Sequence, residues 1–260
     1  MFIQKKVSWQ NFIKYSSASN MRSLLLILAL SLSVALYAQN EDFASDRPGL
    51  SDAPDLIRKN SWQIATGFDI SKYNHYGLYQ LSTSTLKYGI SDRFEARMDF
   101  GLQYDEVLHL FGTNSPAFGL KALVLNQIKY YPKTAFILEY YPPPFASTQQ
   151  PSGLGTEICF SHELNNGNSI YYNMGVNWQD LKLKPVINYL VGYSFEFNDV
   201  WSSFIELYLY KKPGVVLNYV SDIGFTYQLN KKLQMDLSGG IDLVKPKGNF
   251  YYEGGLSYNF

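Results

Sequence analysis

The sequence predicts an all-β fold, an antiparallel transmembrane β-barrel of about twelve strands in a Gram-negative outer membrane. Three observations predict it: apolar and polar residues alternate repeatedly, aromatic residues are abundant, and the chain ends on an aromatic residue within a strand pattern. Aromatic residues make up 17% of the 260 residues, with 22 Tyr and 17 Phe, and rings with a polar tip suit the headgroup level of a bilayer. Mean hydropathy is only −0.16, as expected for barrels, which alternate apolar with polar residues.

The amino terminus has the pattern of a secretion signal. Met21-Arg22 provides a short basic start, and the apolar run that follows ends on the small residue Ala38. The run is too short for a comfortable transmembrane helix, so we predict cleavage after Ala38; the alternative is a single membrane anchor. The predicted organisation is a leader and signal peptide at 1–38, a periplasmic segment at 39–60 and a barrel at 61–260.

Strands are predicted wherever apolar and polar residues alternate. In 94–102, for example, the apolar residues fall on one face, and Glu95, Arg97 and Asp99 fall on the other. The repeats are roughly ten residues long, which is the length that a tilted strand needs to cross a bilayer. The predicted strands are 61–71, 78–90, 94–102, 117–126, 133–142, 153–163, 168–178, 184–196, 200–211, 219–229, 233–243 and 250–260.

The connections between these strands support a membrane barrel. Short and long connections largely alternate, as expected for short periplasmic turns and longer outer loops, although the outer connection at 180–183 is short. The competing fold is a soluble β-sandwich or barrel, whose apolar face points inward. The Trp and Tyr residues of the apolar face, such as Trp62 and Tyr140, favour the membrane. The long connections are predicted at 72–77, 104–116, 143–152, 212–218 and 244–249.

The last strand has the features of an assembly signal. Soluble proteins usually end in a frayed polar tail, whereas this chain ends on phenylalanine. Gly255, Tyr258 and Phe260 resemble the glycine–x–x–aromatic–x–aromatic sorting signal of outer-membrane barrels. The resemblance implies that the barrel-assembly machinery recognises this strand and that outer-membrane lipid surrounds the folded chain. The alternative is an ordinary last strand.

Three segments resemble a known family. They are Ser45–Pro54, which begins Ser-Asp-Arg-Pro, the strand pattern Asn60–Phe68, and the hairpin Leu86–Arg97. They are similar to the outer-membrane transporter family named after the meta-pathway of phenol degradation. The resemblance covers essentially the mature chain, with Ala65 standing where many members have Glu. It implies a barrel that passes small molecules, with hydrophobic or aromatic compounds as candidates.

The face opposite the aromatic residues is predicted to line a lumen in which acids outnumber bases. Such a wall favours cations, or it needs an inserted group that neutralises it. We expect Asp46, Arg47 and Pro48 to form a plug, with Arg47 pairing with lumen carboxylates; the alternative is a solvated periplasmic tail. The candidate lumen residues are Glu95, Arg97, Asp99, Lys121, Glu139, Glu157, Glu206, Asp222, Asp236, Asp242 and Glu253.

The remaining chemistry favours a channel over an enzyme or a nucleic-acid-binding protein. Basic and acidic residues balance at 22 each, so no nucleic-acid partner is expected. Ser161 and His162 point to opposite faces of one strand and cannot pair as nucleophile and base. No metal-ligand cluster or cofactor motif is evident, and none is expected. The sequence therefore predicts a passive channel for small molecules; the alternative is a closed structural or adhesive barrel that acts through its extracellular loops.

Overall fold

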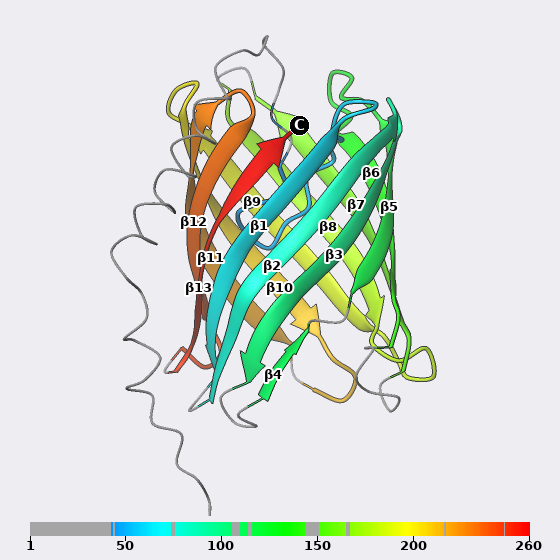
Figure 1. The fold of residues 1–260 in the computed structure, drawn as a ribbon, viewed down its shortest axis with the longest axis vertical. Helices are drawn as coiled ribbons and strands as arrows, with labels where there is room; N and C mark the ends of the chain where they lie inside the picture. The colour runs from blue at the N-terminus through cyan, green and yellow to red at the C-terminus, as the bar shows by residue number, and fades with distance from the viewer. Residues whose placement is uncertain are drawn as a thin grey trace, which may run out of the picture. The chain divides into compact units, whose positions relative to one another are not determined.

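Antiparallel strands close into a single ring in the computed structural model (Figure 1). The first strand, β1, pairs with both β2 and the last strand, β13, so the sheet has no free edge at the chain ends. The predicted antiparallel barrel of about twelve strands is confirmed, because the closed barrel has twelve strand positions. The strands are β1 (Trp62–Tyr73), β2 (Tyr76–Ser91), β3 (Phe94–Asp105), β4 (Leu110–Thr113), β5 (Ala117–Leu125), β6 (Lys133–Tyr141), β7 (Gly153–Glu163), β8 (Ser169–Trp178), β9 (Val186–Glu196), β10 (Trp201–Lys211), β11 (Asn218–Asn230), β12 (Leu233–Asp242) and β13 (Asn249–Asn259).

The structure describes most of the chain after residue 42, with short gaps. The predicted leader and signal peptide, residues 1–38, lie outside the described residues. Within the described part, no helix is long and apolar enough to cross a membrane. The described residues are 43, 45–73, 76–105, 110–113, 116–143, 151–164, 167–215, 217–246 and 248–260.

One short strand was not predicted. β4 lies within the connection predicted at 104–116. The sequence does not reveal this strand because four residues are too few for an alternating pattern to be recognised. Both β4 and β5 pair with β3, at its end and at its beginning respectively. The two short strands therefore share one position in the ring, and the thirteen strands make twelve positions.

Two connections also differ from the prediction. The connection at 72–77 is much tighter than expected, because β1 and β2 continue pairing as far as Tyr73 and Tyr76. Conversely, β8 ends at Trp178 and β9 begins at Val186, so the outer connection predicted at 180–183 is longer than the sequence pattern indicated. Polar and apolar residues alternate weakly at the strand ends, which blurs these bounds.

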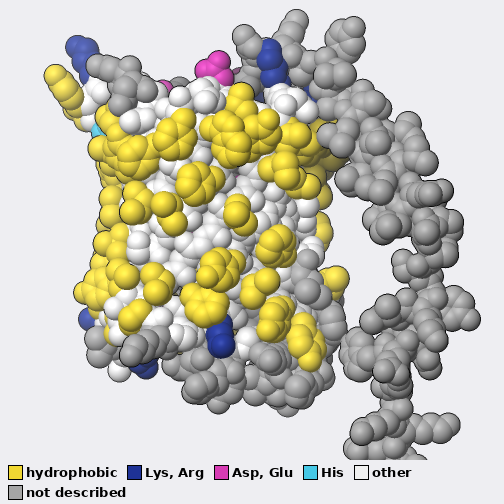
Figure 2. Space-filling model, turned by 90° about the vertical axis from the view of Figure 1, so that its left-hand side faces the viewer, with side chains coloured by type: hydrophobic (Ala, Val, Ile, Leu, Met, Phe, Trp, Pro, Cys, Tyr) yellow, Lys and Arg dark blue, Asp and Glu magenta, His cyan; other side chains and the backbone are white. Residues whose placement is uncertain are grey.

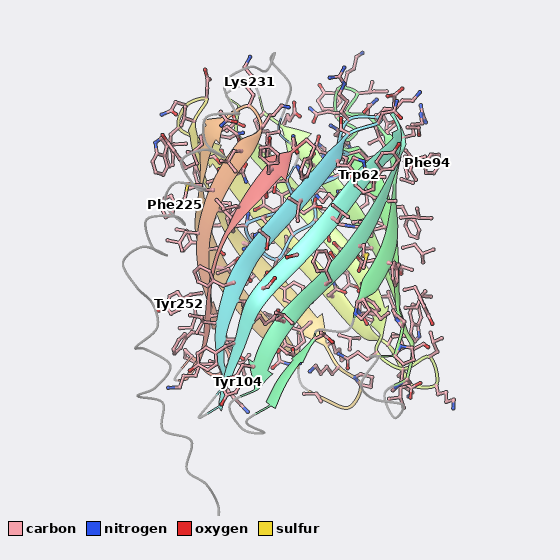
Figure 3. The ribbon with its side chains drawn as sticks, in the orientation of Figure 1. Trp62, Phe94, Tyr104, Phe225, Lys231 and Tyr252 are labelled. Carbon is pink, nitrogen blue, oxygen red and sulfur yellow. The ribbon has the colours of Figure 1, made fainter. Side chains whose placement is uncertain are left out.

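Apolar side chains face outward and polar side chains face inward, the reverse of a soluble barrel. Leu237 in β12 is 59% exposed, whereas inward residues such as Gln63 and Ser257 are completely buried. Figure 2 shows apolar side chains spread over the outer face, with charged side chains near the two ends. Phe94, Phe225 and Tyr252 point away from the ring (Figure 3). This arrangement decides against the soluble sandwich, because a soluble protein would hide these side chains.

Candidate functional site

The candidate site is the lumen, and its wall is polar and charged. All the predicted lumen residues lie on the inner side of the ring. Asp99 accepts a hydrogen bond from Thr85 at 2.5 Å. The most deeply buried members are Glu95, Arg97, Lys121, Glu206, Asp222 and Asp236, and the members that line a cavity are Glu139, Glu157, Asp242 and Glu253.

Residues 45–58, called the N-terminal segment below, lie inside this ring. The segment contains no strand, and its blue trace runs between the front and back strands (Figure 1). It contacts β2, β3 and β5 on one side and β10 and β12 on another. Most of these contacts are hydrogen bonds and ion pairs. The segment therefore fills part of the lumen through polar contacts with several walls.

Asp46 contacts three cations of the barrel wall. Its carboxylate accepts hydrogen bonds from Arg97 Nη2 at 2.6 Å and Lys121 Nζ at 3.1 Å, and it pairs with Lys87. Its Oδ1 also accepts a bond from the backbone N–H of Ala53 at 3.2 Å. Burial acts to raise the pKa of Asp46, but Lys121, Lys87 and Arg97 outweigh it and hold the pKa well below its usual range. Asp46 therefore remains ionised inside the lumen.

Arg47 points to a different wall. Its Nη2 and Nε lie 3.2 and 3.4 Å from the two carboxylate oxygens of Asp236, and Nη1 donates to Thr83 at 3.2 Å. The guanidinium lies against Gly255, where an added Cβ would come within 2.7 Å of Nε. Gly255 is also part of the predicted assembly signal. Its lack of a side chain is also required by the close approach of Arg47, while recognition by the assembly machinery stays a prediction.

Glu206 holds the middle of the segment. It accepts bonds from the backbone N–H of Leu50 at 2.8 Å and from the Ser51 hydroxyl at 2.6 Å. Tyr171 donates to the same carboxylate at 2.9 Å. All three of these donors are neutral. Glu206 is thus stabilised by neutral hydrogen-bond donors from both the wall and the segment.

The end of the segment is fixed to the wall just before β1. The backbone N–H of Ile57 donates to Glu95 at 2.9 Å, and Asp55 pairs with Lys133. The backbone N–H of Asn60 then donates to the carbonyl of Gly89 at 2.7 Å. The segment is therefore hydrogen-bonded to the barrel at the point where the first strand begins.

A cavity of about 770 Å³ adjoins the segment. Arg47 and Asp52 form part of its lining, together with Tyr141, Tyr208 and Tyr251. Its size is within the range of small-molecule sites. The acidic side chains in its wall are Asp52, Asp69, Glu139, Glu157, Asp242 and Glu253.

Sequence reasoning missed Lys87, which is buried against Asp46. The signal was present, because Lys87 stands between the apolar residues Leu86 and Tyr88 in a predicted strand, and alternation turns it inward. The neutral partners Asn173 and Tyr171 carry the same alternation signal, but a search for charged residues does not find them. Asn173 donates to the carbonyl of Asp52 and to Glu157. Across the described ranges, no group of three or more His, Cys, Asp or Glu side chains could hold a metal ion.

Comparisons with known proteins agree with this architecture. The sequence profile of the family described as "Putative MetA-pathway of phenol degradation" matches residues 45–260. The fold is similar to an outer membrane channel from Pseudomonas putida F1, with a TM-score of 0.61, 10% identity, and coverage of 82% of this chain and 100% of that chain. It is also similar to the KdgM porin, in a structure with disordered oligogalacturonate, with a TM-score of 0.57, 8% identity, and coverage of 76% and 99%. A comparison with curated proteins found no match. At these identities, the structural similarities establish the fold alone.

Proposed function

The chain belongs to the family described as "Putative MetA-pathway of phenol degradation", and we propose that it is a passive outer-membrane channel for small molecules. On this proposal, the N-terminal segment obstructs the passage in the closed state. The observation that carries the proposal is a charged lumen with a cavity of about 770 Å³ inside a closed barrel coated with apolar side chains. An apolar coat suits a bilayer, and a polar interior suits the passage of solutes through it.

The way in which the lumen is filled supports a channel. Eight strands give an interior that side chains can fill, and larger barrels leave space. Here a separate chain segment occupies the space, and polar contacts such as Asp46–Arg97 and Arg47–Asp236 hold it in place. Water can replace polar contacts when a segment moves, at lower cost than exposing an apolar core. The segment therefore has the properties of a plug that can be displaced.

The family description makes small aromatic molecules the first solutes to test. The cavity has room for a single aromatic ring, and Tyr141, Tyr208 and Tyr251 offer aromatic faces and hydroxyl groups in its wall. The structures of the Pseudomonas putida channel and the KdgM porin support a channel architecture and leave the solute of this chain to experiment.

Conductance measurements test the proposal directly. Residues 39–260, refolded in a planar bilayer, should give discrete current steps, and a version that lacks residues 39–57 should give larger steps because the obstruction is gone. An Asp55→Ala variant is a matched control, since Asp55 pairs with Lys133 near the surface and is partly exposed. Silence from both chains, with heat-modifiable folding intact, would contradict a channel and would favour a closed structural or adhesive barrel.

A further inference from the structure

Three buried cations of the barrel wall converge on one carboxylate. Lys87 in β2, Arg97 in β3 and Lys121 in β5, called the basic cluster below, all contact Asp46. Their side chains are 2%, 4% and 0% exposed. Lys87 and Arg97 occupy directly opposed positions on neighbouring strands, where like charges repel one another.

The basic cluster needs an anion. Cations removed from water carry a large desolvation penalty unless a counter-charge and hydrogen bonds compensate for it. Asp46 supplies this compensation to all three cations: Oδ2 faces Arg97 and Lys87, and Oδ1 faces Lys121. Asp52 of the same segment also pairs with Arg97, at 2.9 Å from Nη1. Asp46 does not belong to the wall, because it lies on the N-terminal segment. If the segment leaves the lumen, the cluster loses its anion and another anion is favoured in its place.

We propose that the basic cluster is a binding site for the carboxylate of a small organic acid, which Asp46 occupies in the closed channel. The proposal rests on the proposed function, since displacement of the segment is what opens the site to solutes. The Asp46 carboxylate shows the geometry that a solute carboxylate would adopt, with one oxygen between Arg97 and Lys87 and the other at Lys121.

The surrounding charges limit the site to a monoanion. Glu95 interacts electrostatically with Lys121, and Asp99 and Glu139 interact with Arg97. These three wall carboxylates weaken the attraction of the cluster for anions at longer range, so a singly charged carboxylate is favoured over a multiply charged anion. The acidic wall of the adjoining cavity also opposes the approach of anions. The apparent affinity is therefore expected in the millimolar range, about 1–100 mM, as for a weak site.

Chemical rescue of Asp46→Ala tests the site without requiring conduction. The full mature chain, residues 39–260, is refolded in detergent, and its thermal midpoint is followed while sodium acetate, sodium benzoate or sodium chloride is added at constant ionic strength. The midpoint of Asp46→Ala should lie below that of the unsubstituted chain. Acetate and benzoate should raise it saturably, by about 5 °C near saturation, because ligand binding stabilises the folded state. Chloride, a spherical ion that cannot bridge the three cations with two oxygens, should have a smaller effect.

Asp55→Ala is the matched control. It also removes a segment carboxylate that pairs with a wall lysine, but the Asp55–Lys133 pair is partly exposed, with side chains 38% and 23% exposed. Water can solvate the remaining lysine, so carboxylates should not shift its midpoint more than chloride does. If Asp46→Ala fails to fold, Asp46→Ser, whose smaller side chain also leaves room for a bound carboxylate, is titrated in its place.

The outcomes separate this inference from the proposed function. Saturable rescue by carboxylates, absent in the control, supports the site even if no current is seen. Rescue that is equal for chloride and carboxylates would overturn the assignment to organic acids. Absence of any rescue, alongside discrete current steps, would overturn the site while leaving the channel in place.

Discussion

Asp46 and Arg47 are neighbours in the sequence, and they neutralise charges of opposite sign on different parts of the barrel wall. Asp46 neutralises cations on β2, β3 and β5, and Arg47 neutralises Asp236 on β12. Neither charge would be stable in the lumen alone, because isolated buried charges are costly. The Asp-Arg pair therefore positions the segment by requiring both walls to be contacted at once.

Gly119 controls the position of Arg97. A Cβ at this site would lie 2.5 Å from Arg97 Cγ and 3.2 Å from Glu139 Cγ. Gly119→Ala should therefore push Arg97 away from Asp46 and lower the free energy of unfolding by about 1–3 kcal/mol, as overpacking does. Urea titration of the refolded barrel, followed by tryptophan fluorescence, measures the change.

Gly112→Ala is the control for that experiment. Nothing lies within 4 Å of a Cβ added there, so the free energy of unfolding should change by less than about 0.5 kcal/mol. Equal effects at Gly112 and Gly119 would show that the loss comes from the strand backbone and not from Arg97.

The ionisation of Asp46 predicts how the segment responds to acid. Because the folded pKa lies below the ordinary value of 3.8, the stabilisation is fully present above that pH and is lost as pH falls through the folded pKa. The difference in unfolding free energy between the unsubstituted chain and Asp46→Asn should be constant from neutral pH down to about pH 4, at about 3 kcal/mol. It should shrink at lower pH, where Asp46 takes up a proton. A difference that already declines between pH 7 and 5 would contradict this assignment.

At the scale of elements, we expect the wall to open most readily where β4 and β5 share one position. β3 pairs with β5 over its first residues and with β4 over Leu102–Asp105. Among the described residues, β4 pairs with β3 alone, whereas β9 pairs with both β8 and β10. A four-residue strand with one partner has few hydrogen bonds to resist opening.

Amide hydrogen exchange should reveal this difference. Peptides that contain Leu110–Thr113 should exchange at least about tenfold faster than peptides from Val186–Glu196, because local opening of a short strand is less costly. Mass spectrometry of the refolded chain in detergent measures both sets in one sample. Equal protection would mean that β4 is held by contacts other than its pairing with β3.

At the scale of the whole molecule, the apolar outer surface makes the barrel stable in a lipid bilayer. Leu237 lies near the middle of β12 and is 59% exposed, and Leu243 follows the end of the strand and is 51% exposed. In a bilayer, Leu237→Arg should cost about 2–4 kcal/mol and Leu243→Arg about 0–1 kcal/mol, because the cost depends on depth. Urea unfolding from lipid vesicles measures both, and equal costs would argue against this placement in the bilayer.

Much of this fold could be predicted from the sequence, because a membrane barrel obeys a simple period. Alternation identified the strands and turned Glu95, Arg97 and Lys121 inward, as the structure has them. It could not find β4, which is shorter than the pattern needs, nor the tight connection between Tyr73 and Tyr76. Twelve strand positions follow from the pattern, whereas the sharing of one position by two strands depends on long-range pairing.

The site was less predictable than the fold. Alternation tells which side chains face the lumen, but the partner that each will meet depends on the path of a segment without regular structure. The Asp-Arg-Pro motif led to Arg47 as a partner for carboxylates, and the structure places it against Asp236. The convergence of Lys87, Arg97 and Lys121 on Asp46 requires three strands and the segment together, and no local pattern reports it.

The hydrogen bond from Asn60 to Gly89 affects how strongly Asp46 competes with solutes for the basic cluster. Because the segment is joined to β1 through this fixed point, Asp46 is a tethered ligand and its return to the basic cluster is an intramolecular event. A short flexible tether gives an effective concentration in the millimolar range or above. If the cluster binds solute as proposed, a diffusible solute must reach a comparable concentration to replace Asp46, and the barrel would then stay closed in dilute surroundings and open as solute accumulates.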